Sequence, residues 1–208
     1  MNKKEMLESV SWYLSQFEEI GEKEKKILEA MSEVDRADFM PGNLRDVAYE
    51  DTAIGIGHGQ TISQPSTVAR MLQLLELEKG DRVLEVGAGS GWNAGLFGYI
   101  VGSVLSLEIV EGLFDSAKEK LKKYENIKVE KKDFRELRQK FDKIVFTAGI
   151  SSGQENIIEE FAEGRLNEEG ILVCPYRSGS LIVIRKKDGK IVKGFTREEY
   201  GFVELVLK

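Results

Sequence analysis

The chain has 208 residues, with 30 lysines and arginines against 36 aspartates and glutamates, so its formal net charge is −6. Hydrophobic residues make up 41% of the sequence, as in a globular protein with one sizeable core. This composition excludes disordered, collagenous and membrane-spanning classes. The acidic balance disfavours a protein that wraps nucleic acid, which needs a concentrated basic surface. We therefore expect no nucleic-acid partner and no membrane partner.

The sequence contains one cysteine, Cys174, and one histidine, His58. A single cysteine cannot form an intrachain disulfide, which favours a reducing compartment. Near the N-terminus, Glu5 and Glu8 interrupt the stretch that a signal peptide needs to be apolar. Cys174 and His58 are too few nitrogen and sulfur ligands for a zinc site of the usual kind. We expect a cytoplasmic protein without a metal.

The helical spacing of apolar residues predicts two amphipathic helices at the start of the chain, over residues 3–19 and 22–34. Residues 38–64 lose this period and collect glycines, which predicts a long loop. Loops of this length in compact domains are usually functional or disordered, and the apolar residues within this one favour order. Pro65 suits the first turn of a third helix, with Ser63 or the following residue just before it.

After Gly80, apolar runs alternate with helical stretches as far as residue 176. This alternation is typical of a parallel sheet covered by helices on both faces. The tail has apolar runs without intervening helices around the turn signal Asp188-Gly189, which predicts antiparallel strands in SLIVIRKKDGKIV and EYGFVELVL.

A glycine-rich segment, EVGAGSG over residues 85–91, follows the first predicted strand of this sheet. Glycines there let the backbone turn sharply and approach a ligand closely. A dinucleotide fingerprint would have its third glycine one position later, so the spacing favours S-adenosylmethionine over NAD. The alternative is a tight turn that only packs a helix on a strand.

Acidic residues end the next two predicted strands. Glu108 ends the second strand, where a carboxylate can accept hydrogen bonds from both ribose hydroxyls. Asp133 ends the third, beside Phe134, and can accept a hydrogen bond from the adenine amino group while apolar atoms flank the ring. Each carboxylate taken alone could be a solvated strand end. Their order along the chain favours a ligand, because open sheets of this type bind at the carboxyl ends of strands.

The predicted loop contains a second motif, IGHGQTISQP over residues 56–65. Gln60, Thr61 and Ser63 supply uncharged donors that could orient a carboxylate without protonating it. The alternative is that Thr61 or Ser63 caps the helix at Pro65, and both roles can coexist. We assign no chemistry to His58.

With these motifs together, the sequence resembles the protein-L-isoaspartate (D-aspartate) O-methyltransferase family, a repair branch of the class I S-adenosylmethionine-dependent methyltransferases. The resemblance covers most of the chain, and its most distinctive part is the segment 57–65. It implies an α/β fold with a doubly wound, mostly parallel, seven-stranded Rossmann-like sheet, N-terminal helices and antiparallel C-terminal strands. Residues 1–64 would pack on a cofactor-binding core of residues 65–208 as one compact unit.

The resemblance also implies an activity: methyl transfer from S-adenosylmethionine to the free α-carboxylate of L-isoaspartyl residues in damaged proteins and peptides, without a metal. S-adenosylhomocysteine would be the second product, and a monomer is expected. Ser63 would be the active-site hydroxyl. Glu85 and the glycines of its motif would hold the methionine end, Glu108 the ribose, and Asp133 with Phe134 the adenine. The implied cofactor-binding residues are Gln60, Thr61, Ile62, Glu85, Gly87, Gly89, Gly91, Glu108, Ile109, Asp133 and Phe134.

The sequence departs from the family's pattern most strongly at its end, where FVELV over residues 202–206 replaces the usual proline-leucine-threonine-glycine stretch. Smaller departures are Asp35, Trp92 and residues 149–151. Two other functions stay open. One is a class I methyltransferase with a tRNA or small-molecule acceptor, and the other is a module that binds isoaspartyl ends without methylating them.

Overall fold

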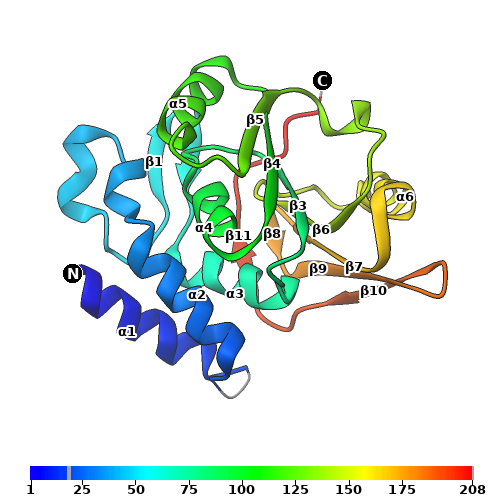
Figure 1. The fold of residues 1–208 in the computed structure, drawn as a ribbon, viewed down its shortest axis with the longest axis horizontal. Helices are drawn as coiled ribbons and strands as arrows, with labels where there is room; N and C mark the ends of the chain where they lie inside the picture. Colours follow the sequence, from blue (N-terminus) through cyan, green and yellow to red (C-terminus); the bar gives the residue numbers. More distant parts are fainter. Residues whose placement is uncertain (18–19, 208) are drawn as a thin grey trace.

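The computed structural model describes residues 1–17 and 20–207. A seven-stranded sheet in the order β10-β9-β7-β6-β3-β4-β5 forms its centre (Figure 1). The parallel part contains β3 (Arg82–Val86), β4 (Ser103–Glu108), β5 (Ile127–Lys131), β6 (Phe141–Phe146) and β7 (Leu166–Pro175). The edge next to β7 is antiparallel and consists of β9 (Leu181–Lys187) and β10 (Lys190–Phe195). The predicted mostly parallel sheet with antiparallel C-terminal strands is confirmed.

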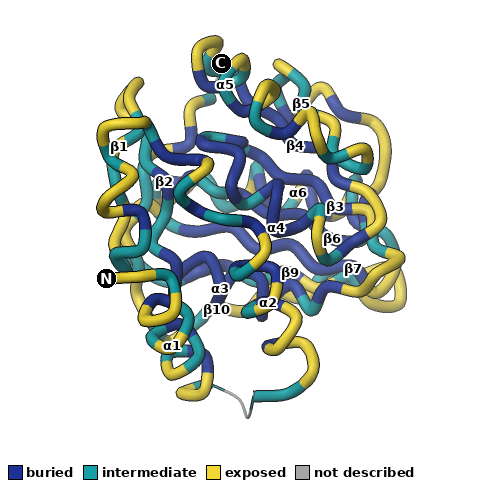
Figure 2. The backbone as a smooth tube through the Cα atoms, turned by 60° about the vertical axis from the view of Figure 1, so that its left-hand side comes forward, coloured by how far each residue is buried: buried dark blue, intermediate teal, exposed yellow. Residues whose placement is uncertain are grey.

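Helices cover both faces of this sheet, which is why its central parallel strands contain runs of buried apolar residues. One face packs against α1 (Lys3–Leu14), α2 (Glu22–Glu33), α3 (Pro65–Leu75), α4 (Trp92–Ile100) and α5 (Glu111–Leu121). The other face packs against α6 (Glu155–Arg165) and the short turn η3 (Phe134–Glu136). Figure 2 shows the buried strands between these layers.

Residues 38–64 are more regular than a loop. They contain the end of η1 (Arg36–Phe39), then η2 (Gly42–Val47) and a hairpin of β1 (Ile54–Gly57) and β2 (Gln60–Ile62). The glycines of this hairpin interrupt the alternation of apolar and polar side chains that would predict strands. The helix expected over residues 3–19 ends at Leu14, and residues 18–19 lie outside the described residues.

The last predicted strand run is only partly a strand. Within EYGFVELVL, β11 (Tyr200–Gly201) pairs with β8 (Ser178–Gly179), and Glu204 forms an isolated bridge to Gly149. The run does not join the central sheet, and the predicted antiparallel pairing is limited to Tyr200–Gly201. The apolar side chains that produced this pattern face a cavity and the core beneath it.

Across the described part of the chain, no helix has the length and apolar character that spanning a bilayer requires.

Candidate active site

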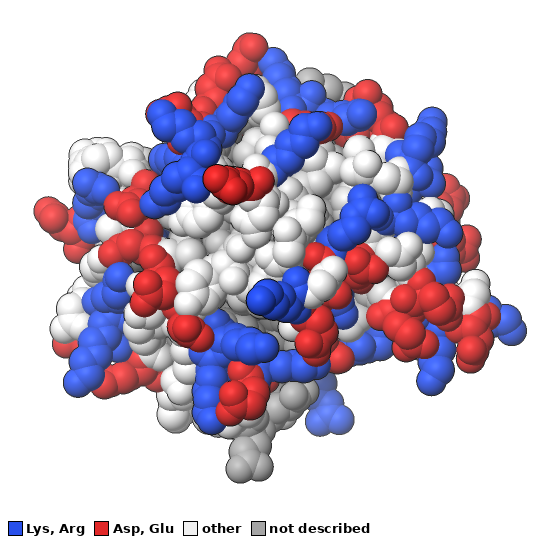
Figure 3. All heavy atoms as spheres, viewed as in Figure 1, with Lys and Arg blue, Asp and Glu red and all other residues white. Residues whose placement is uncertain are grey.

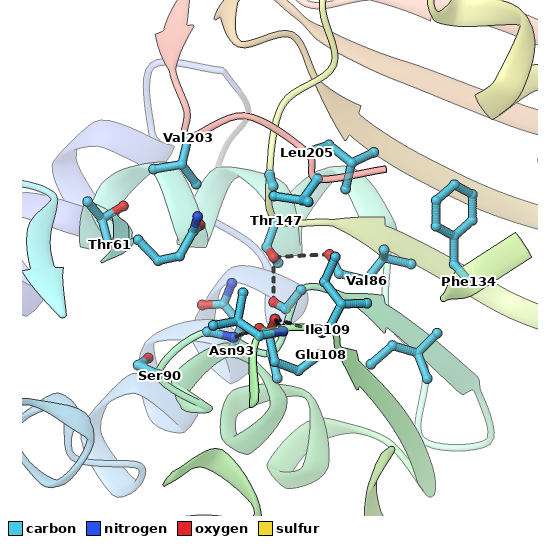
Figure 4. A pocket seen from close by; sticks show the side chains of 18 of the residues that line it. Thr61, Val86, Ser90, Asn93, Glu108, Ile109, Phe134, Thr147, Val203 and Leu205 are labelled. Atoms are coloured by element: carbon cyan, nitrogen blue, oxygen red, sulfur yellow. Dashed lines mark hydrogen bonds between the residues drawn. The ribbon is translucent and has the colours of Figure 1, made fainter. Parts of the chain in front are cut away.

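A cavity of about 800 Å³, its open mouth included, lies at the carboxyl ends of the parallel strands. Figure 4 shows Thr61 on one side, Glu108 and Ile109 below, Phe134 on the far side, and Val203 and Leu205 above. Most of the sequence-predicted residues line it: Gln60, Thr61, Ile62, Ser63, Gly87, Gly89, Glu108, Ile109, Asp133 and Phe134. The fold therefore brings both sequence motifs to one site.

The glycine motif forms a tight loop between β3 and α4. Gly87, Gly89 and Gly91 have φ angles of +102°, +53° and +89°, a region that residues with a side chain rarely adopt. A Cβ atom on Gly87 would also collide with the hydroxyl of Thr147. That hydroxyl lies 2.5 Å from the carbonyl oxygen of Gly87 and 3.1 Å from that of Val86, so it holds the loop from β6. The loop needs glycine for both conformation and space.

The carboxylate of Glu108 accepts three backbone hydrogen bonds. The N–H of Gly89 donates to Oε2 at 2.9 Å, while those of Ile109 and Val110 donate to Oε1 at 2.8 and 2.9 Å. Glu108 is buried but lines the cavity. Because a carboxylate can accept about four hydrogen bonds, it retains capacity for a ligand hydroxyl. It joins the glycine loop to the end of β4.

Asp133 and Phe134 lie at the far end of the cavity. The Phe134 ring meets the rings of Phe146 and Phe161 edge-on, at centroid distances of 5.0 and 4.9 Å, which fixes its position in the core. The Asp133 carboxylate accepts hydrogen bonds from the backbone and guanidinium N–H groups of Arg135. This end of the cavity combines an apolar wall with hydrogen-bond acceptors.

The segment carrying Ser63 enters the cavity just before α3. Among the described residues the Ser63 hydroxyl makes no hydrogen bond, so it is available to a ligand. Neither Thr61 nor Ser63 caps α3. Instead, the carboxylate of Asp51 accepts a hydrogen bond of 2.9 Å from the N–H of Ser66. The capping alternative is therefore wrong, and the polar side chains of this segment face the cavity.

Arg36 holds this segment in place, although nothing in the sequence predicted this role. One terminal nitrogen donates to the carbonyl of Ala48 at 2.5 Å. The other donates to the carbonyls of Thr52 and Ser63, each at 3.0 Å. The side chain is fully buried over the ring of Trp92, and burial lowers the pKa of its guanidinium to about 10. A buried arginine surrounded by carbonyls leaves no periodic pattern in a sequence.

Glu85 and Gly91 do not line the cavity. Glu85 is completely buried, and one carboxyl oxygen accepts a hydrogen bond from the Ser106 hydroxyl while Oε1 has no partner within the described structure. Burial raises the pKa of this carboxyl to about 8. Gly91 faces Leu121 on α5 instead. Both residues support the loop from behind.

Several further residues line the cavity without belonging to any motif recognised in the sequence. Asn93 lies in the first turn of α4, and Thr147 follows β6. The C-terminal residues Val203, Glu204, Leu205 and Val206 form the upper wall. Backbone hydrogen bonds of 2.8 Å from Gly149 to Val203 and from Leu205 to Gly149 hold this wall in place. The atypical C-terminal segment is thus part of the site.

The sequence model of the family described as protein-L-isoaspartate (D-aspartate) O-methyltransferase matches residues 8–208. The chain belongs to this family. Two relatives named protein-L-isoaspartate O-methyltransferase illustrate the similarity. The one from Methanococcus aeolicus is 38% identical over 185 residues, covering 82% of each chain. The one from Serratia proteamaculans is 36% identical over 200 residues, covering 93% of each chain.

Solved structures agree with this membership of the protein-L-isoaspartate O-methyltransferase family. A putative member from Plasmodium falciparum in complex with S-adenosyl-L-homocysteine has a TM-score of 0.77 and 26% identity, with 99% of both chains covered. Another structure named protein-L-isoaspartate O-methyltransferase has a TM-score of 0.81 and 24% identity, covering 99% of this chain and 66% of that chain. The predicted family, the Rossmann-like methyltransferase fold and S-adenosylmethionine as cofactor are confirmed.

Proposed function

We propose that the cavity binds S-adenosylmethionine along β3, β4 and β5, and that Ser63 orients the α-carboxylate of an L-isoaspartyl residue for methylation. The loop at Gly87 and Gly89 would hold the methionine end, with Glu85 behind it, Glu108 beside Ile109 the ribose, and Asp133 with Phe134 the adenine. The observation that carries this proposal is that the Ser63 hydroxyl, without a hydrogen bond among the described residues, shares one cavity with the glycine loop and Glu108.

The chemistry needs no general base. A carboxylate has an ordinary pKa of about 4, so it is already ionised at neutral pH. S-adenosylmethionine, when bound, supplies an electrophilic methyl group on a sulfonium. The chain's own residues then have to align the carboxylate oxygen with the carbon–sulfur bond. The hydroxyl of Ser63 and the backbone N–H groups of residues 60–63 would fix its angle and distance.

The site must also remove water from the carboxylate. Apolar residues supply much of the wall, including Ile62, Leu107, Val203 and Leu205. Replacing water by a few fixed donors leaves the attacking oxygen accessible while holding its direction. Arg36 contributes as a positioning residue, because it binds the carbonyl of Ser63 from outside the cavity. The methyl ester formed would cyclise to a succinimide without further help.

Ser63→Ala tests the proposed role of this hydroxyl. We expect turnover with an isoaspartyl peptide to fall on the order of 100-fold, as when a positioning contact is lost. Ser66→Ala is a matched control, since Ser66 is a buried serine on α3 that does not line the cavity. If turnover of Ser63→Ala falls by less than about threefold, Ser63 has no part in the proposed mechanism.

We further propose that the enzyme works as a cytoplasmic monomer on isoaspartyl proteins and peptides. The lone cysteine, Cys174, is buried and unpaired, as expected in a reducing compartment. One chain supplies lining residues from both its N-terminal hairpin and its C-terminal segment, so the cavity needs no second copy. Size-exclusion chromatography with light scattering tests the oligomeric state.

A further inference from the structure

The turn of the β1–β2 hairpin has an unusual backbone. Gly57, His58 and Gly59 have φ angles of +91°, +54° and +70°, three successive left-handed residues. His58 is the only one of them with a side chain, and a histidine in this conformation is uncommon. The His58 side chain is exposed at this turn.

The ring of His58 lies on Gly112 in the first turn of α5. A Cβ atom added to Gly112 would lie 2.6 Å from Nε2 of the ring and 2.8 Å from Cε1. Gly112 has an ordinary helical backbone without a positive φ, so conformation does not demand glycine there. A Cβ there would instead meet the far end of the exposed His58 side chain, which would have to shift to make room for it.

This contact joins two walls of the cavity. Gln60 and Thr61 follow the His58–Gly59 turn on the hairpin and line one wall, while Ile109 and Val110 precede α5 and line another. The hairpin also lies over the glycine loop, because Ile56 Cδ1 is 3.9 Å from the position of a Cβ on Gly89. Figure 1 shows the hairpin beside α5.

We propose that His58 is a positioning residue whose ring, seated on Gly112, sets the distance between the hairpin and α5 and so the width of the cofactor cavity. This inference rests on the proposed function, since it takes the cavity to hold S-adenosylmethionine. The two residues form a matched pair: the glycine provides the space that the ring fills. The role is steric and requires no proton transfer by the imidazole.

Gly112→Ala tests this pair, with Gly164→Ala as the control. Both replace a glycine inside a helix, but a Cβ on Gly164 meets nothing within 4 Å. Alanine favours the helix, so Gly164→Ala should raise the melting temperature by about 2 °C and leave cofactor binding unchanged. Gly112→Ala should weaken S-adenosylhomocysteine binding about tenfold by calorimetry, because the new methyl group displaces one wall.

Kinetics separate this role from general destabilisation. For Gly112→Ala the KM for S-adenosylmethionine should rise about tenfold, while kcat at saturation stays within about twofold of wild type. A fall in kcat alone, or a dissociation constant within about twofold of wild type, would overturn the inference.

His58→Asn supplies the second variant and keeps the test independent of the folding of Gly112→Ala. Asparagine tolerates the left-handed conformation but is too short to fill the space over Gly112. We expect binding about threefold weaker than wild type, and no further loss in the double variant His58→Asn/Gly112→Ala. If Gly112→Ala weakens binding as much in His58→Asn as it does in the wild type, the pairing of His58 with Gly112 is contradicted. S-adenosylhomocysteine binds without a methyl acceptor. The binding test therefore stays valid even if the acceptor is not an isoaspartyl residue.

Discussion

Two glutamates at the ends of neighbouring strands have opposite environments. Glu85 is enclosed, bonded only to the Ser106 hydroxyl among the described residues, and its pKa is raised to about 8 by burial. Glu108 faces the cavity and accepts three backbone N–H groups. The same residue type is therefore a buried carboxyl with a raised pKa in one strand and an acceptor of backbone hydrogen bonds in the next. Burial and hydrogen bonding decide between these roles.

Glu85→Gln should change how stability depends on pH. The folded-state pKa of about 8 lies above the ordinary value of 4.5, so the stability tied to the neutral carboxyl is complete below pH 4.5 and is lost as pH rises through 8. Wild type should lose up to about 1.4 kcal/mol per pH unit in this window. The glutamine variant should lack this slope. Urea unfolding at several pH values measures how the free energy of unfolding changes with pH. Equal slopes in the two proteins would show that Glu85 is not a neutral carboxyl in the folded protein.

Glu108→Ala should weaken S-adenosylhomocysteine binding by at least about tenfold, because the substitution removes a ribose acceptor and leaves the N–H of Gly89 without its partner. Isothermal calorimetry measures the dissociation constant. Glu159→Ala offers a comparison, since Glu159 lies on α6, pairs with Lys193 and does not line the cavity. Unchanged affinity in Glu108→Ala would exclude Glu108 from the cofactor site.

At the scale of elements, the site depends on segments far from the sheet. Arg36 at the start of η1 holds the carbonyls of the segment that ends at Ser63. On the other side, α1 contacts the C-terminal segment through a hydrogen bond of 2.8 Å between the hydroxyls of Tyr13 and Tyr200. Tyr200 and Phe202 pack edge-on, and the chain then enters the upper wall of the cavity. Helix α1 thereby supports the atypical C-terminus.

Tyr13→Phe should lower the free energy of unfolding by about 1 kcal/mol, because it leaves the half-buried Tyr200 hydroxyl without its partner. The double variant Tyr13→Phe/Tyr200→Phe should lose less than the sum of the two single variants, since it removes both polar groups. Tyr99→Phe, which loses an exposed hydrogen bond to Glu29, should change stability by less than about 0.5 kcal/mol. Urea unfolding of the wild type, the two single variants and the double variant measures these free energies. Additive losses in the free energy of unfolding would show that the two hydroxyls do not interact.

At the scale of the whole molecule, sequence periodicity predicted the sheet because its parallel strands are buried on both faces and read as apolar runs. The glycine motif and Glu108 were predictable since they follow such runs directly. Arg36 and the Tyr13–Tyr200 contact were not, because each joins segments distant in sequence through polar groups that leave no period. The final segment differs from its prediction, because only Tyr200–Gly201 pairs as a strand while Val203 and Leu205 line the cavity.

The function proposed for this chain is methylation of the free α-carboxylate of isoaspartyl residues. The most direct test incubates the protein with labelled S-adenosylmethionine and two peptides that differ only in an isoaspartyl or an ordinary aspartyl linkage. We predict base-labile label on the isoaspartyl peptide alone. Label on neither peptide, with S-adenosylhomocysteine still bound, would contradict the claim and direct attention to another acceptor or to a module that binds without transfer.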